Sequence, residues 1–122
     1  MRAAEGIKYA IPGSLAEALD IQANPKTRGT LLAGGTDLMA QWAAGVPVPE
    51  RVTVLRGLAE LEGIEIDRRR RLARVGAATT HGAIRDHAGL KAGLPALWAA
   101  SGSVGARQIQ AVGTIGGNVA NA

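Results

Sequence analysis

The residues most suited to a chemical function lie in two glycine-rich segments. The first is LLAGGTDL (31–38), where a short apolar run ends in glycines before a helical pattern, and the second is VGTIGGNVANA (112–122). Glycine has no Cβ, so a ligand oxygen can approach its backbone closely. Free N–H groups at the start of a helix attract an anion. Either segment alone could be a simple tight turn, but two of them in a short chain favour a diphosphate held from two sides.

The side chains around these glycines suggest how each segment is built. We expect Thr36 to cap the helix after the first segment, and Asp37 to lie in its first turn. Asp37 would then either orient loop amides or favour the helix dipole, and the second role is preferred. The second segment is a poor helix and a poor strand, so it is expected to be a loop whose Gly116 and Gly117 expose their N–H groups, with Thr114 and Asn118 adding side-chain donors.

Several other kinds of site are excluded or disfavoured. No G-x-G occurs and no glycine precedes a lysine, which removes the Rossmann fingerprint and the P-loop. The chain has no cysteine, so it offers no thiolate for an iron–sulfur centre. The histidines, His81 and His87, have no carboxylate cluster beside them and are expected to be exposed or capping. Arg107 could neutralise a phosphate or be a surface charge, and Trp98 is expected in the core or at an interface.

The first half of the chain alternates between short strand and helix patterns. Strands are predicted at 7–11, 30–35 and 52–55. Ser14 and Glu17 form a capping-box pattern before the first helix, and Gly45 can end the second. This order predicts a small parallel βαβαβ unit.

The pattern changes after that unit. The runs GIEI and LARVGA flank Arg68–Arg71 and predict an antiparallel hairpin with an exposed arginine turn. A helix is predicted over 80–90, and the segment 94–105 is expected to begin as a helix and to loosen at its glycines and serines. The fold class is therefore α/β (α+β), with an N-terminal subdomain at 1–56 and a mixed second subdomain at 57–122.

Composition limits the core and the partners. The chain of 122 residues has no Phe, one Tyr and two Trp, so its core should be thin and built from Ala, Leu, Val and Ile. The net charge of +4 and the arginine turn would allow RNA binding with a strong salt dependence, but a solvated turn is preferred. Because a solvated arginine turn is preferred, we expect no nucleic-acid partner. No apolar run reaches membrane length and no signal peptide is visible, so we expect a cytoplasmic protein with no membrane insertion.

Both glycine segments, and the runs IKYAIPGSLAEALDI, VGAATTHGAI and LPALWAASGSVGARQIQAVGTIGGN, resemble the FAD-binding medium subunit of molybdenum hydroxylases. This family includes xanthine dehydrogenase-like, carbon monoxide dehydrogenase-like and aromatic-CoA reductase enzymes. The resemblance implies a PCMH-type FAD-binding fold, also called the vanillyl-alcohol-oxidase type. The FAD-binding residues it implies are Ala33, Gly34, Gly35, Thr36 and Asp37 in the first loop, Thr114, Ile115, Gly116, Gly117 and Asn118 in the second, and Ala78, Thr79 and Thr80 near the flavin.

The resemblance also implies a role in electron transfer. Substrate would be oxidised at a molybdenum cofactor in a large subunit, and electrons would pass through [2Fe–2S] centres in a small subunit to FAD in this chain. FAD would then reduce NAD, a quinone or oxygen. The alternative is a nucleotide- or phosphate-binding module without redox chemistry.

The chain departs from the family pattern in two respects. Gln110 and Ala111 stand where the family usually has an Arg and an Asn before the second loop. Similar proteins also continue well beyond the second glycine segment, so this chain is expected to be an N-terminal fragment that is inactive alone.

Overall fold

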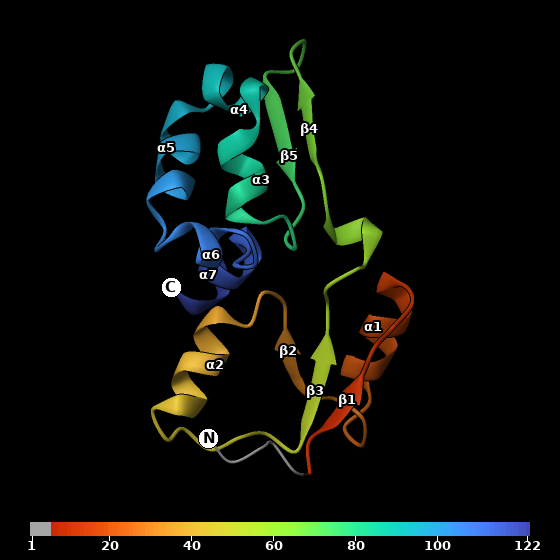
Figure 1. Cartoon of the computed structure of the whole chain (residues 1–122). Coiled ribbons are helices and arrows are strands. Elements are labelled where there is room, and N and C mark those ends of the chain that lie inside the picture. The colour runs from red at the N-terminus through yellow and green to blue at the C-terminus, as the bar shows by residue number, and fades with distance from the viewer. Residues whose placement is uncertain (1–5) are drawn as a thin grey trace.

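The computed structural model describes residues 6–122 and begins with a parallel sheet. Its strands are β1 (Lys8–Ala10), β2 (Thr30–Leu32) and β3 (Arg51–Val54), in the spatial order β1-β3-β2. Both pairings are parallel, with Val52 opposite Tyr9 on one side and Thr30 on the other. The predicted parallel βαβαβ unit is confirmed (Figure 1).

Helix α1 (Leu15–Ala23) connects β1 to β2 and begins at the predicted cap. Ser14 Oγ accepts a hydrogen bond from the N–H of Glu17 at 3.2 Å, as a capping box requires. The reciprocal bond is shifted by one residue, because Glu17 Oε2 accepts from the N–H of Gly13 at 2.7 Å rather than from Ser14. Gln22 Nε2 donates to Thr53 Oγ1 at 2.7 Å and so ties α1 to the central strand.

Helix α2 (Thr36–Ala43) connects β2 to β3, and its start differs from the prediction. Gly35 is the N-cap residue with a φ of +76°, no side chain caps the helix, and Thr36 is its first residue. The predicted Thr36 cap is therefore wrong, because the left-handed backbone of Gly35 makes the turn from strand to helix. The helix ends as predicted before Gly45, whose φ is +94°.

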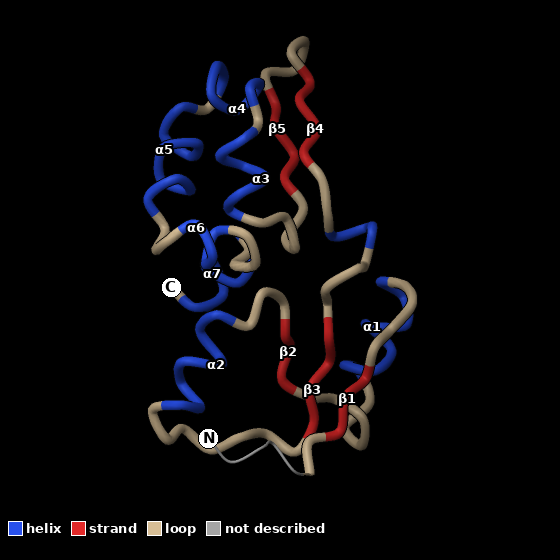
Figure 2. Tube along the Cα trace, in the orientation of Figure 1, coloured by secondary structure: helices blue, strands red, loops and turns tan. Residues whose placement is uncertain are grey.

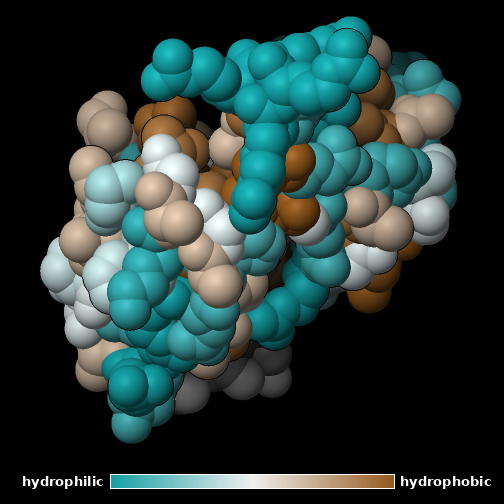
Figure 3. Space-filling model, turned by 90° about the horizontal axis from the view of Figure 1, so that it is seen from above, coloured by the Kyte–Doolittle hydropathy of each residue, from teal (hydrophilic) through white to brown (hydrophobic). Residues whose placement is uncertain are grey.

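The second part of the chain begins with the short helix η1 (Ala59–Leu61) and a hairpin of β4 (Ile64–Asp67) and β5 (Leu72–Val75). The strands pair antiparallel from Ile64–Val75 to Asp67–Leu72, which confirms the predicted hairpin. Arg71 adopts a φ of +54° in the turn. Figure 3 looks down on this end of the molecule and shows hydrophilic residues gathered in an arm, with hydrophobic residues exposed beside it.

Five short helices follow the hairpin: α3 (His81–Asp86), α4 (Ala88–Gly93), α5 (Pro95–Ser103), α6 (Arg107–Gln110) and α7 (Ile115–Asn121). The helix expected over 80–90 is broken at His87, whose Nδ1 accepts from the N–H of Leu90 at 3.2 Å and caps α4. Trp98 Nε1 donates to the carbonyl of Arg85 at 2.5 Å, which ties α5 to α3. The second glycine segment forms α7, so the expectation of a loop there is wrong.

The buried apolar core is small, as the composition predicts. Among residues 6–122, the buried apolar side chains are Ala18, Val52, Leu58, Ala78, Ile84 and Leu90. Large apolar side chains such as Ile11 and Val119 are 75% and 70% exposed. None of the helices in this range has both the length and the apolar character needed to cross a bilayer.

Candidate functional site

The two glycine segments meet although they lie far apart in the sequence. The segment between β2 and α2 faces the one between α6 and α7 (Figure 2). A Cβ added to Gly34 would overlap the carbonyl oxygen of Val112 and lie 2.9 Å from Cα of Gly113. The two segments are therefore in backbone contact, and Gly34 is required by the chain itself rather than by a ligand.

A cavity of about 350 Å³ lies against both segments. It is lined on the first segment by every residue that the resemblance implies, and on the second by most of them. These lining residues are Ala33, Gly34, Gly35, Thr36, Asp37, Ala78, Thr114, Gly116, Gly117 and Asn118. Ile115 lines neither this cavity nor the one described below.

The first segment presents free hydrogen-bond donors. Within residues 6–122, the N–H groups of Gly34, Gly35, Thr36 and Asp37 have no acceptor. They stand at the N-terminus of α2, where the helix dipole also favours a negative charge. The carboxylate of Asp37 accepts from Asn121 Nδ2 at 3.3 Å, so its recorded partner links α2 to α7 and is not a loop amide. The arrangement fits a phosphate group.

In the second segment, the backbone N–H groups already donate hydrogen bonds within the protein. The N–H groups of Ile115 and Gly116 bond to the carbonyls of Thr79 and Ala77 at 3.0 and 2.8 Å. The N–H of Gly117 bonds to Thr114 Oγ1 at 3.1 Å, and that of Asn118 to the Thr114 carbonyl. The prediction that Gly116 and Gly117 expose their N–H groups is therefore wrong.

The reason for glycine at position 116 is close packing. A Cβ there would lie 2.6 Å from the carbonyl oxygen of Ala77, so α7 can approach the preceding segment only without a side chain. The contact is extended by an antiparallel bridge between Thr80 and Thr114. The second segment thus contributes a wall to the cavity, together with the Asn118 side chain, rather than a row of amide donors.

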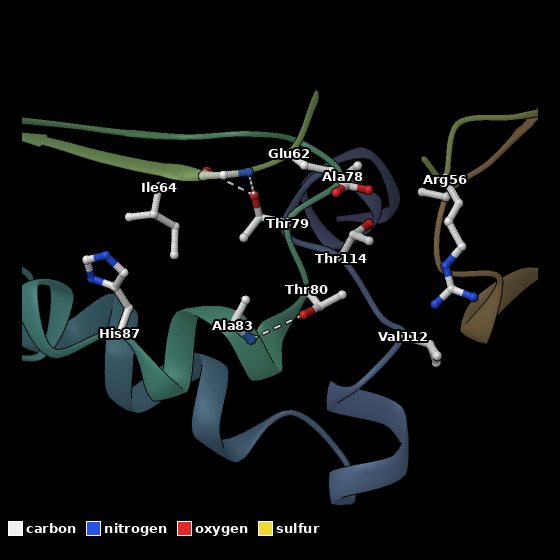
Figure 4. A pocket seen from close by; sticks show the side chains of 12 residues that line it. Arg56, Glu62, Ile64, Ala78, Thr79, Thr80, Ala83, His87, Val112 and Thr114 are labelled. Carbon is white, nitrogen blue, oxygen red and sulfur yellow. Dashed lines mark hydrogen bonds between the residues drawn. The ribbon is translucent and has the colours of Figure 1, made fainter. Parts of the chain in front are cut away.

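A second cavity of about 320 Å³ adjoins the first, because Ala33, Ala78 and Thr114 line both. Figure 4 shows its lining, with Arg56 at one side and His87 at the other. Thr79 Oγ1 bonds to both the N–H and the carbonyl of Gly63, at 3.1 Å each. The Thr80 hydroxyl accepts from the N–H of Ala83 at 3.1 Å. Both threonines therefore line this cavity while holding local structure.

Arg56 is a charged lining residue that sequence analysis missed. In the sequence it is one of many arginines, and its position at the edge of the parallel sheet distinguishes it from them. It follows Leu55, whose N–H bonds to the carbonyl of Leu32 at 2.8 Å, so Arg56 and Ala33 leave neighbouring strands at the same edge. Arg56 could have been found in the sequence from its position, because it follows the carboxyl end of a parallel strand beside a glycine turn.

Residues in front of the second segment have structural roles. Gln110 is buried, its Oε1 accepts from the Arg85 guanidinium at 2.6 Å, and its Nε2 donates to the carbonyl of Gly102 at 2.9 Å. Gln110 thus joins α6 to α3 and α5. Hydrogen bonds from Arg85, aided by the charge of Arg107, hold the pKa of Asp86 below its ordinary value. Arg107 is exposed and lines neither cavity, so it is a surface charge.

The two histidines differ in environment. His87 has the predicted capping role. His81 is only 2% exposed, which contradicts the expected exposed or capping position; its Nδ1 lies 3.5 Å from Ser101 Oγ, and its Nε2 has no partner among residues 6–122. No group of three or more His, Cys, Asp or Glu side chains in that range is placed to hold a metal ion.

Comparison with known proteins identifies the family. Residues 5–122 match the family described as the FAD binding domain in molybdopterin dehydrogenase. The chain is 37% identical over 114 residues to the xanthine dehydrogenase FAD-binding subunit of Escherichia coli O157:H7, covering 93% of this chain and 38% of the relative. It is 35% identical over 89 residues to the nicotinate dehydrogenase FAD-subunit of Eubacterium barkeri, covering 73% of this chain and 29% of that protein.

Solved structures agree with the fold. A chain of the CO dehydrogenase from Oligotropha carboxidovorans superposes with a TM-score of 0.82 at 32% identity, over 94% of this chain and 40% of that one. A chain of the carbon monoxide dehydrogenase from Hydrogenophaga pseudoflava gives 0.85 at 28% identity, over 93% and 39%. The chain thus spans about two fifths of the length of the xanthine dehydrogenase subunit and of the two CO dehydrogenase chains. With its parallel sheet, antiparallel hairpin and paired glycine segments, the chain belongs to the family of FAD-binding domains of molybdopterin dehydrogenases.

Proposed function

We propose that the chain binds FAD across the two adjoining cavities, with the diphosphate at the N-terminus of α2. The observation that carries this proposal is that both glycine segments line one cavity, and that the N–H groups of Gly34 to Asp37 are free to donate. A bound phosphate would satisfy these donors and would interact favourably with the helix dipole. The second segment would close the site by shape, through α7.

The lining of the two cavities suits the remainder of the cofactor. Apolar side chains, including Leu31, Leu55 and Leu61, line the first cavity and offer surface for an aromatic ring. Polar and charged groups, including Arg56 and Glu62, line the second. Each volume is at the lower end of the range of about 300 to 1,000 Å³ that ligand pockets occupy. An extended dinucleotide that passes Ala33 and Thr114 would use both.

We further propose that the chain acts as an oxidoreductase subunit in a molybdenum hydroxylase complex. Bound FAD supplies the capacity to accept electrons and pass them on, and the protein binds and orients it. The [2Fe–2S] centres would be held by a small subunit and the molybdenum cofactor by a large one, since this chain has no cysteine to ligate a cluster. The electron acceptor would be NAD, a quinone or oxygen. The relatives named as FAD-binding subunits support this assignment.

The direct test is a titration of FAD with the purified chain, followed by flavin fluorescence and with ADP as competitor. We expect saturable FAD binding that Gly117→Val weakens, because Gly117 lines the cavity. Gly93→Val is the matched control, since a Cβ at Gly93 meets nothing within 4 Å and Gly93 lines neither cavity. Absence of saturable binding would contradict the proposal. Equal affinity for ADP and FAD would point instead to a nucleotide-binding module without redox chemistry.

A further inference from the structure

We propose that Arg56 is a phosphate-binding residue, whose guanidinium pairs with a diphosphate oxygen of FAD and so sets the preference of the site for FAD over riboflavin. This inference rests on the proposed function, because it assumes that FAD occupies the two cavities. It adds a positively charged side chain to the site. Neither glycine segment contains one, and Arg56 is not part of a sequence motif.

The position of Arg56 follows from the sheet. Strand β3 is central, and the bond from the N–H of Leu55 to the carbonyl of Leu32 continues the β2–β3 pairing to its carboxyl end. One residue beyond this bond, Arg56 follows β3 and Ala33 follows β2, so both residues lie at the same edge of the sheet. Arg56 then lines the second cavity together with Ala33 and Thr114, which also line the first. Arg56 thus lines the cavity that adjoins the one against the two glycine segments.

The side chain is directed into the site. Figure 4 shows Arg56 at the side of the cavity opposite His87, with its guanidinium extending toward Val112. At the same edge of the sheet, Ala33 begins the segment whose free N–H groups lie at the start of α2. A phosphate bound at this edge would lie near both the backbone donors and the guanidinium.

The charges of the site support the same conclusion. Of the described residues that line the two cavities, Arg56 is the only lysine or arginine, whereas Asp37 and Glu62 are acidic. A cation there would favour a dianionic diphosphate beside these two carboxylates. The Glu62 carboxylate accepts from the N–H of Gly57 at 3.3 Å, and Arg56 forms no hydrogen bond or ion pair within residues 6–122. A planar guanidinium with free donors is well suited to pair with phosphate oxygens.

The test compares FAD, ADP and riboflavin binding to the chain and to Arg56→Gln, Arg56→Lys and Arg69→Gln. Arg69→Gln removes the same charge in the hairpin turn, outside both cavities. We expect Arg56→Gln to weaken FAD and ADP binding by about tenfold, as for the loss of a charged hydrogen bond. Riboflavin, which has no phosphate, should bind as before. Arg56→Lys should recover part of the loss, and Arg69→Gln should match the wild type.

Each other outcome has a definite meaning. FAD and ADP binding by Arg56→Gln within about twofold of the wild type would overturn the inference and leave the proposed function standing. An equal loss of riboflavin binding would also overturn it, because Arg56 would then act through the flavin ring or the fold. If the wild-type chain binds no FAD, the proposed function fails first and the inference fails with it. Because Arg56 is exposed, the variants should unfold at the wild-type temperature, which circular dichroism would check.

Discussion

At the scale of single residues, the glycines of the site serve different purposes. Gly34 and Gly116 allow close backbone approach within the protein, and Gly35 provides a left-handed turn. A Cβ added to Gly117 would lie 3.1 Å from Thr114 Oγ1, and Gly117 lines the cavity. A glycine-rich segment can therefore look like a ligand-binding motif while most of its glycines satisfy the fold, and variants at these positions report on different properties.

The first prediction concerns Gly34. We expect Gly34→Ala to lower the free energy of unfolding by about 1 to 3 kcal/mol, because its Cβ would overlap the Val112 backbone, which cannot move as a flexible side chain can. Urea unfolding followed by circular dichroism measures the change. Gly93→Ala is the control and should be neutral or stabilising by up to about 1 kcal/mol, since it adds a methyl group to open space at the end of a helix. Equal stability of Gly34→Ala and wild type would show that the two segments are not in contact.

At the scale of elements, helix α1 is held at its N-terminus by side chains from two parts of the chain. Ser14 and Glu17 come from the helix itself, whereas Glu60 reaches from η1 and accepts from the N–H of Leu15 at 3.1 Å. This backbone hydrogen bond, followed by one from the N–H of Glu60 itself, lowers the pKa of the Glu60 carboxyl below its ordinary value. The bond joins the parallel sheet unit to the segment that leads into the hairpin.

The second prediction is the pH dependence of this contact. Because the pKa of Glu60 is lower in the folded chain than in the unfolded chain, its contribution is complete above the unfolded pKa and is lost as the pH falls through the folded value. Stability of the wild type should thus fall more in acid than that of Glu60→Gln. Urea unfolding from neutral pH into the acid range measures both curves, with Glu65→Gln as the control for charge at an exposed hairpin position. Parallel curves for wild type and Glu60→Gln would exclude the contact.

The elements also show how far the sequence predicts this structure. The hairpin and the Ser14 cap are local features, and both were predicted correctly. Helix α7 was missed because glycines disfavour helices, and it forms with support from bonds to Thr79 and Ala77, which lie far away in the sequence. The Thr36 cap was wrong because Gly35, in a left-handed conformation, takes the N-cap position and has no side chain to cap the helix. That the two glycine segments act together was predicted. Which segment offers free N–H groups and which only lines the cavity depends on tertiary contacts.

At the scale of the whole molecule, the candidate site lies between the two parts of the chain. Its free donors come from the β2–α2 segment of the parallel unit, and its opposite wall comes from α7 and the segment that precedes α3. The direct ties between these parts that the structure records are few and include Glu60 with Leu15 and Asp37 with Asn121. A ligand that occupies both cavities would add contacts to each part at once.

The third prediction follows from that placement. Bound FAD should slow hydrogen exchange both in β3, at Val52 and Thr53, and in α3, at Ile84, because a ligand that contacts both parts stabilises both against opening. At about 100 times the dissociation constant, the linkage amounts to about 2.7 kcal/mol, and amides that exchange by global unfolding should be slowed to match. The free amides of Gly34 to Asp37 should gain direct protection, whereas those of Ile115 to Asn118, already bonded, should gain less. Protection confined to one part of the chain would mean that FAD does not bridge the two, and the proposed binding mode would then be wrong.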